Sequence, residues 1–334
     1  MPPEYAIAGI GLAAVIVYAV LGGADFGGGI WDLLARGPRK DAQRDAIAAA
    51  MGPVWEANHV WLIFVIVLIF TAFPRAYAAL SIALYVPFHL VLLGITLRGA
   101  AFVFRAYSPR RGGVGRTAGE RHWGAVFGAA SVFTPALLGM CLGAVSAGNL
   151  RITGGDVRVI GAPPWFQPVA LAIGALALAL CAYLAAVFLA NETHGELRDD
   201  FRRRALGAGT VVVALSGLAL PLLQIEAEHL WTGLVSGAGT PVLIPGIAAA
   251  LLSGVALLRR WYRLARAAAI AQVSLLLAGW GLAQMPFLIF PDLTFSDAAA
   301  PEPTLRFMLW STPIGLALLL PSLWLLFRVF KAER

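Results

Sequence analysis

Ionisable side chains inside otherwise apolar segments are the residues of this 334-residue chain that are best placed to do chemistry. They are Asp25, Glu56, His59, His89 and Arg98. A charge at membrane depth costs about 3 kcal/mol or more and is retained mainly where it binds, pairs or relays protons. Carboxylates beside an imidazole can pass protons, and two facing imidazoles can ligate haem or a metal ion. These five side chains form the candidate site.

Positions in the sequence place these groups at similar depths if the segments form antiparallel helical hairpins. Asp41 lies near the centre of the first loop. Asp25 before it and Glu56 after it are almost equally far from Asp41 in the sequence. His59 and His89 are equally far in sequence from Pro74, in the next turn. At about 1.5 Å of rise per residue, each pair is expected at one level. Counting predicts depth but not the direction in which a side chain points.

Membrane-spanning helices are the elements that must position these groups. Hydrophobic residues make up 60% of the chain and charged residues 13%, about half the charged share of a typical soluble domain. Mean hydropathy is +0.79. We therefore expect an all-α integral membrane protein with helices packed as bundles in a single domain over residues 1–334. Nine segments have the required length: 6–23, 57–73, 76–97, 124–147, 167–190, 207–225, 241–258, 267–290 and 307–330.

The distribution of basic residues predicts the orientation. Lys and Arg accumulate in cytoplasmic loops, and an arrangement with the N-terminus outside and the C-terminus cytoplasmic puts nearly all of the 25 basic residues on the inside. The exceptions are Arg75, Arg151, Arg158 and Arg306. No basic residue precedes the first segment, so we expect it to remain as a helix and not to be removed as a signal peptide. The net charge of +7 thus reflects topology, which argues against nucleic-acid binding.

Other sequence features narrow the chemistry. Cys141 and Cys181 lie within predicted helices and supply neither a zinc site nor a disulfide framework. Five glycines around Asp25 are expected to let helix backbones approach closely. The residues alone leave three functions open: a proton path, a subunit with its own b-type haem between His59 and His89, and a proton- or ion-coupled secondary transporter. The sequence contains no convincing internal repeat of the kind that many transporters have.

Three ordered motifs resemble the second subunit of cytochrome bd-type quinol oxidases, a group that includes the cyanide-insensitive oxidases. The motifs are GGADFGGGIWDLL, GPVWEANHVWLI followed by FPRAYAALS, and LRGAAFVFR. The resemblance implies a terminal oxidase of the bacterial cytoplasmic (inner) membrane that reduces O2 to water with electrons from quinol. It also implies a larger partner subunit, subunit I, which carries two b-type haems, haem d and the quinol-oxidising loop. No catalytic or metal-binding residue is then expected in this chain, which would not be active alone.

The resemblance also suggests roles for the candidate residues. Asp25 matches the acid of the glycine-rich motif, and Glu56 matches a position that is Asp or Glu in the family. We expect both to belong to a cytoplasmic proton path to the haem site, with His59 and His89 as relay or hydrogen-bond partners and Arg98 as a counter-charge. The resemblance argues against haem ligation by the two histidines.

The quinone is expected to enter as substrate or as a structural ligand. Trp55 matches a tryptophan that lies against a bound quinone in some members, which makes it a candidate quinone contact. Some members have Gly and Gln where Ala57 and His59 stand, so His59 cannot be essential to the shared mechanism. The resemblance is also compatible with a small single-helix accessory subunit and with surrounding membrane lipid as partners.

Overall fold

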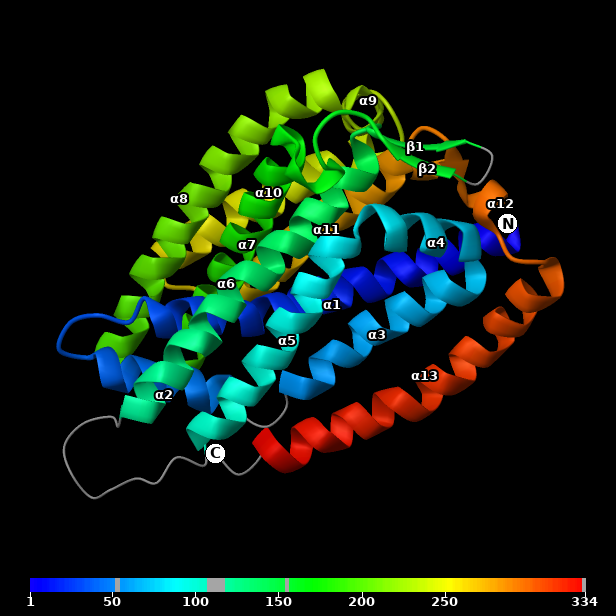
Figure 1. Ribbon diagram of the computed structural model, residues 1–334. Coiled ribbons are helices and arrows are strands. Elements are labelled where there is room, and N and C mark those ends of the chain that lie inside the picture. The colour runs from blue at the N-terminus through cyan, green and yellow to red at the C-terminus, as the bar shows by residue number, and fades with distance from the viewer. Residues whose placement is uncertain (52–54, 107–117, 154–155, 332–334) are drawn as a thin grey trace.

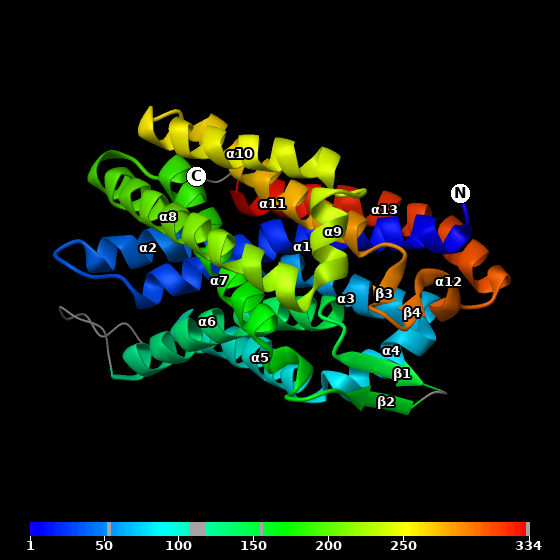
Figure 2. The same cartoon turned by 90° about the horizontal axis from the view of Figure 1, so that it is seen from above.

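The computed structural model describes the chain except residues 52–54, 107–117, 154–155 and 332–334, and it describes only the backbone at some flanking positions, including Trp55 and Glu56. The described residues form a bundle of long helices, with the two termini at opposite ends (Figures 1 and 2). The helices are α1 (Pro3–Leu33), α2 (Lys40–Met51), α3 (Trp55–Ala72), α4 (Pro74–Ala83), α5 (Tyr85–Ala106), α6 (Ala118–Ser146), α7 (Pro168–Glu192), α8 (Gly195–Glu226), α9 (Glu228–Val235), α10 (Thr240–Leu258), α11 (Tyr262–Gln284), α12 (Phe295–Ala298) and α13 (Glu302–Lys331), with a short 3₁₀ turn, η2, at Pro164–Phe166.

Helix α1 lies at the centre of the bundle. It packs against α7, α3 and α6, and it also contacts α2, α11 and α13. Neighbours in sequence pair around it, since α5 packs on α6, α7 on α8 and α10 on α11. In Figure 2, α10 and α11 form one edge of the bundle and α5 and α6 form the other. A charged residue on α1 can therefore meet side chains from several helices.

The membrane topology predicted from the sequence agrees with these helices. Within the described residues, eight helices are long and apolar enough to cross a membrane, and there are nine if α3 and α4, which meet at a bend of 118°, are counted as one span. We call one end of the bundle the basic end, because the α1–α2 loop, the α7–α8 turn and the α10–α11 turn bring most of the described Lys and Arg residues there. The other end, the strand end, holds the N-terminus and four short strands (Figure 2). Assignment of the basic end to the cytoplasm stays a prediction.

At three places a helix break, a strand or an additional helix interrupts the predicted pattern of segments. The third span was predicted at residues 76–97, but residues 74–83 form the separate helix α4 and the spanning helix α5 begins at Tyr85. The eighth was predicted to continue to residue 290, but α11 ends at Gln284 and a strand follows. The loop between the first two spans contains a further helix, α2, which packs against α1 and α7. Hydropathy detects apolar segments, and it does not separate α4 from α5 or α11 from the following strand because all of these residues are largely apolar. Helix α2 escapes it for the opposite reason, since α2 is rich in charged residues.

Two short hairpins cover the strand end. Strand β1 (Leu150–Thr153) pairs antiparallel with β2 (Asp156–Val159), and β3 (Phe287–Ile289) pairs with β4 (Leu293–Thr294). Arg151 joins the hairpins, because its Nε donates a hydrogen bond to Asp292 Oδ2 over 2.7 Å and its Nη2 donates to Oδ1 over 3.0 Å. These hydrogen bonds from Arg151 lower the pKa of Asp292. The Arg151–Asp292 pair therefore stabilises the contact between the two hairpins fully at pH values above the ordinary pKa of an aspartate. This stabilisation is lost as the pH falls through the lowered pKa of Asp292.

The glycines of α1 allow close helix packing, as the sequence predicted. A Cβ atom at Gly27 would overlap the main-chain carbonyl oxygen of Cys181 on α7, and one at Gly29 would overlap the Ser131 hydroxyl on α6. These two positions face different neighbours, so α1 approaches α6 and α7 at the same level. Removing side-chain volume in this way is a common means of bringing membrane helices together.

We expect the substitution Gly27→Ala to destabilise the protein by about 1–3 kcal/mol, the usual cost of inserting a carbon into a packed core. The apparent melting temperature of the purified protein in detergent measures this effect. Gly9→Ala is the matched control, because Gly9 is on the same helix and a Cβ there meets no atom within 4 Å. Equal melting temperatures for the two variants would contradict this account of the α1–α7 contact.

Candidate functional site

Arg98 is a fully buried cation at the centre of the bundle, with 1% of its surface exposed. From α5 its Nη2 donates a hydrogen bond to the main-chain carbonyl oxygen of Asp25 on α1 over 2.9 Å. Its Nε donates to Ser131 Oγ on α6 over 3.1 Å. The rings of Phe26 and Phe127 lie 4.9 Å and 5.0 Å from the guanidinium carbon. One side chain thus joins α1, α5 and α6 and binds the main chain of Asp25, while its role as a counter-charge stays a prediction.

A second arginine of α5 contacts α1 about two helical turns further towards the basic end. Arg105 on α5 forms a two-point ion pair with Asp32 on α1, with N–O distances of 3.0 Å and 3.2 Å. The Asp32 side chain is only 4% exposed and that of Arg105 17%. Both contacts join residues 73 apart in sequence, so α1 and α5 run in the same direction and in register here.

The Asp32–Arg105 pair was not predicted from the sequence. Arg105 was assigned to a basic loop, whereas it lies within α5 and binds α1. One signal was present: Asp25 and Asp32 are seven residues apart, as are Arg98 and Arg105. Seven residues make about two helical turns, so this matched spacing could have indicated two cross-helix contacts.

Asp25 itself faces the start of α3. Its side chain is half-buried, and Asn58 Nδ2 donates a short hydrogen bond to Asp25 Oδ2. Asn58 lies two residues after Glu56, which supports the expected similar depth of Asp25 and Glu56, although α2 makes the connection more than a simple loop. The side chains of Glu56 and Trp55 lie outside the described residues.

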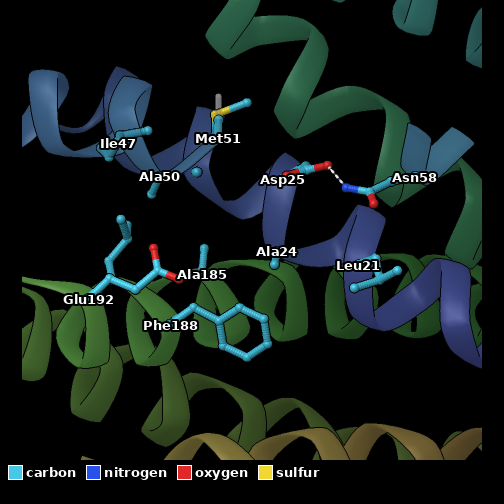
Figure 3. Close-up of a pocket in the computed structure, with 12 residues that line it drawn as sticks. Leu21, Ala24, Asp25, Ile47, Ala50, Met51, Asn58, Ala185, Phe188 and Glu192 are labelled. Carbon is cyan, nitrogen blue, oxygen red and sulfur yellow. Dashed lines mark hydrogen bonds between the residues drawn. The ribbon is translucent and has the colours of Figure 1, made fainter. Parts of the chain in front are cut away.

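Asp25 also lines a cavity of about 100 Å³ between α1, α2, α3 and α7 (Figure 3). A water molecule takes about 30 Å³ of liquid volume, so the cavity has room for about three. Most of its wall is apolar, but Asn58 and Glu192 line it as well. In Figure 3, Glu192 and Asp25 lie on opposite sides of it. Glu192 is the exposed last residue of α7, at the basic end.

Two members of this site, Glu192 and Asn58, were not predicted from the sequence. Glu192 follows the predicted fifth span and looked like an ordinary loop acid, and only the packing of α7 against α1 shows that it shares a cavity with Asp25. Asn58 is neutral, so a search for ionisable groups passes over it.

His59 belongs to the same group of side chains. Its Nδ1 lies 3.5 Å from the Tyr18 hydroxyl, and its ring centre lies 5.9 Å from those of Tyr18 and Phe26. Phe26 also contacts Arg98. The structure therefore brings together Asp25, His59 and Arg98, three of the five side chains selected from the sequence.

His89 does not join this group of side chains, and the expectation that it shares a level with His59 stays a prediction. It lies near the start of α5 at Tyr85, whereas His59 lies several turns before the end of α3 at Ala72. The count had assumed a continuous helix after Pro74, but α4 and the break at its end intervene. His89 is exposed, and its Nδ1 donates to the Tyr85 carbonyl oxygen over 2.7 Å. Its role as a relay partner stays a prediction without geometric support.

The described residues also bear on metal binding. No group of three or more His, Cys, Asp or Glu side chains among them is arranged to hold a metal ion. Cys141 and Cys181 are buried and not disulfide-bonded. The chemical groups that the described site offers are therefore carboxylates, an amide, an imidazole and a guanidinium around a small cavity.

Comparison with known proteins identifies relatives over nearly the whole chain. The family model described as cytochrome bd terminal oxidase subunit II matches residues 3–330. The cytochrome bd-I ubiquinol oxidase subunit 2 of Escherichia coli (strain K12) is 26% identical and aligns over 95% of this chain and 91% of its own. A Bacillus subtilis protein provisionally named cytochrome bd menaquinol oxidase subunit II is 23% identical over 96% of this chain and 93% of its own. In the solved bd oxidase of Geobacillus thermodenitrificans, one chain has the same fold, with a TM-score of 0.82, 22% identity and 98% of each chain covered.

We expect Asp32→Asn or Arg105→Gln alone to destabilise the protein by about 3–5 kcal/mol, because each leaves a buried charge without its partner. The double variant should be more stable than the worse single variant, since its two neutral amides leave no charge to compensate. Melting temperature and yield of folded protein measure all three. A double variant with the summed loss of both singles would show that the two side chains do not interact energetically.

Proposed function

This chain belongs to the family of cytochrome bd terminal oxidase subunit II, and from that premise we propose that it carries protons from the basic end towards an oxygen-reducing site in a larger partner subunit. The complex would reduce O2 to water with electrons from quinol. Each O2 reduced consumes four protons, so the oxygen site needs a path from water through the membrane domain. This chain would supply part of that path and act as a scaffold for the partner.

The cavity beside Asp25 is the observation that supports this proposal most directly. It has a carboxylate that is exposed at the basic end, Glu192, and a half-buried carboxylate, Asp25. Its volume suits a few water molecules, which can link acids that do not touch. A proton taken up by Glu192 would pass through this water to the Asp25 carboxylate. Asn58 would fix the orientation of that carboxylate through its hydrogen bond.

The groups around Asp25 support onward transfer. Glu56 lies in the first turn of α3, two residues before Asn58, and we assign it as the next carrier. His59 is placed to donate or accept a hydrogen bond within the same group. Arg98 would balance the negative charge that Asp25 carries between transfers, because its guanidinium binds the same turn of α1. His89 is left outside this path because of its position.

We place the two b-type haems and haem d in the partner subunit. His59 is enclosed by Tyr18 and Phe26, whereas His89 is exposed near the start of α5 and its Nδ1 binds the Tyr85 carbonyl oxygen. The two imidazoles thus do not fit the facing pair of axial ligands that a b-type haem within this chain would need. Trp55 is proposed as a contact for a structural quinone, and quinol is the substrate of the complex.

We expect Asp25→Asn and Glu56→Gln to lower oxygen consumption per haem on the order of a hundredfold, the low end for the loss of a positioned proton-transfer group. Haem content of the purified complex should stay normal. Glu56→Asp should keep much of the activity, because it keeps a carboxyl group. The double amide should be little worse than the worse single, since successive carriers act as one unit.

Glu192→Gln tests the entrance of the path and should also slow turnover per haem. Glu196→Gln is its matched control: this acid is 79% exposed at the same end and pairs with Arg39, but does not line the cavity. Normal turnover per haem in Asp25→Asn and Glu56→Gln would refute the proton path. Loss of haem and assembly with normal turnover per remaining haem would instead assign these acids to helix packing.

A further inference from the structure

A second hollow opens at the basic end, away from Asp25. It has a volume of about 580 Å³ and lies between the α7–α8 turn and the α10–α11 turn. It is lined by His194 and by three arginines: Arg198 near the start of α8, Arg260 in the α10–α11 turn and Arg263 near the start of α11. No carboxylate is among the described residues that line it. Two turns that are far apart in sequence therefore converge to form a concave, strongly basic site.

Local structure holds the arginines in place around this hollow. Arg198 Nε donates to the Thr193 carbonyl oxygen over 2.6 Å, and its guanidinium lies 4.9 Å from the centre of the Tyr262 ring. Arg260 has a φ of +62°, a left-handed conformation that no other non-glycine residue in the described part of the chain adopts. Residues other than glycine adopt this conformation at a cost. The tight α10–α11 turn thus uses an unfavourable backbone conformation at a residue that lines the hollow.

These arginines differ from others at the same end. Arg39 is neutralised by Asp200 and Glu196, with N–O distances of 2.7 Å and 2.9 Å. In the hollow, Arg260 has a looser contact of 3.5 Å with Asp199, and the two side chains are 62% and 39% exposed. A general excess of basic residues in cytoplasmic loops explains charge at this end, but it does not explain why three guanidinium groups surround one cavity.

Guanidinium groups are well suited to bind phosphate, because their N–H donors match its oxygens in pairs. The rim of the hollow is apolar and aromatic: Trp261 and Leu264, which line it, are 57% and 38% exposed. Tryptophan is typical of the membrane–water boundary, and basic pockets between helix ends recognise anionic lipid headgroups. We propose that this hollow binds the phosphate group of an anionic phospholipid, with Arg198 and Arg263 as the principal ligands and the rim against the acyl chains.

The test measures ligand binding to the detergent-purified, delipidated complex by native mass spectrometry, with phosphatidylglycerol, phosphatidylcholine and inorganic phosphate as probes. Wild type should retain phosphatidylglycerol in preference to phosphatidylcholine. The double variant Arg198→Gln/Arg263→Gln should bind phosphatidylglycerol roughly tenfold to a hundredfold more weakly, because two charge-assisted hydrogen bonds are lost. Arg203→Gln/Arg259→Gln is the matched control, with the same change of charge at exposed positions that do not line the hollow.

Competition identifies the source of the phosphate group. Phosphatidylglycerol binding that resists inorganic phosphate would identify a lipid headgroup, whereas displacement by inorganic phosphate, with loss of phosphate binding in the pocket variant, would identify the free anion. Equal phosphatidylglycerol binding by the pocket and control variants would overturn the proposal. If the double variant does not assemble, the single variant Arg263→Gln should still bind phosphatidylglycerol more weakly than Arg259→Gln does. Equal phosphatidylglycerol binding by these two single variants would overturn the proposal as well.

Discussion

The burial of the Arg98 guanidinium within the membrane bundle is the constraint on which the rest of the structure depends. A cation removed from water is tolerated only when acceptors are placed around it, and here these come from the main chain of α1 and from Ser131 on α6. They can reach it only because α1 approaches its neighbours closely at its glycines. The Asp32–Arg105 pair repeats the contact two turns later, so α1 and α5 cannot slide past one another without losing both.

This fixed register places the functional groups. Helix α1 is held by its contacts with Arg98 and Arg105 of α5. In this position, the Asp25 side chain of α1 faces Asn58 on α3 and the cavity that α1 shares with α2 and α7. The same helix thus carries a structural contact on its carbonyl group and a proposed proton carrier on its side chain. Helix α2 contributes Ile47, Ala50 and Met51 to the cavity wall. The function proposed for Asp25 therefore depends on residues that have no part in proton chemistry.

Features that depend on local properties of the chain were predictable from the sequence. Apolar length identified the spans, and the glycine-rich stretch correctly indicated close packing around Asp25. The Asp25–Asn58 contact places the start of α3 beside Asp25, although α2 lies between α1 and α3 in the sequence. Counting residues from Pro74 to His89 did not anticipate α4, which lies between α3 and α5. The pairing of Arg105 had one signal in the sequence, the matched seven-residue spacing of the two acids and the two arginines. The cavity position of Glu192 had none, because it depends on which helices become neighbours.

Water access through the cavity to Asp25 is the central claim, and thiol labelling of Ala50→Cys tests it most directly. Ala50 lines the cavity, both native cysteines are buried, and Ala48→Cys on the exposed face of α2 is the control. We predict that a small charged methanethiosulfonate reagent modifies both introduced cysteines in the complex. It should strongly reduce oxygen turnover per haem only in Ala50→Cys, because the adduct fills the cavity. Complete modification at position 50 with unchanged turnover, or no modification there at all, would contradict the account.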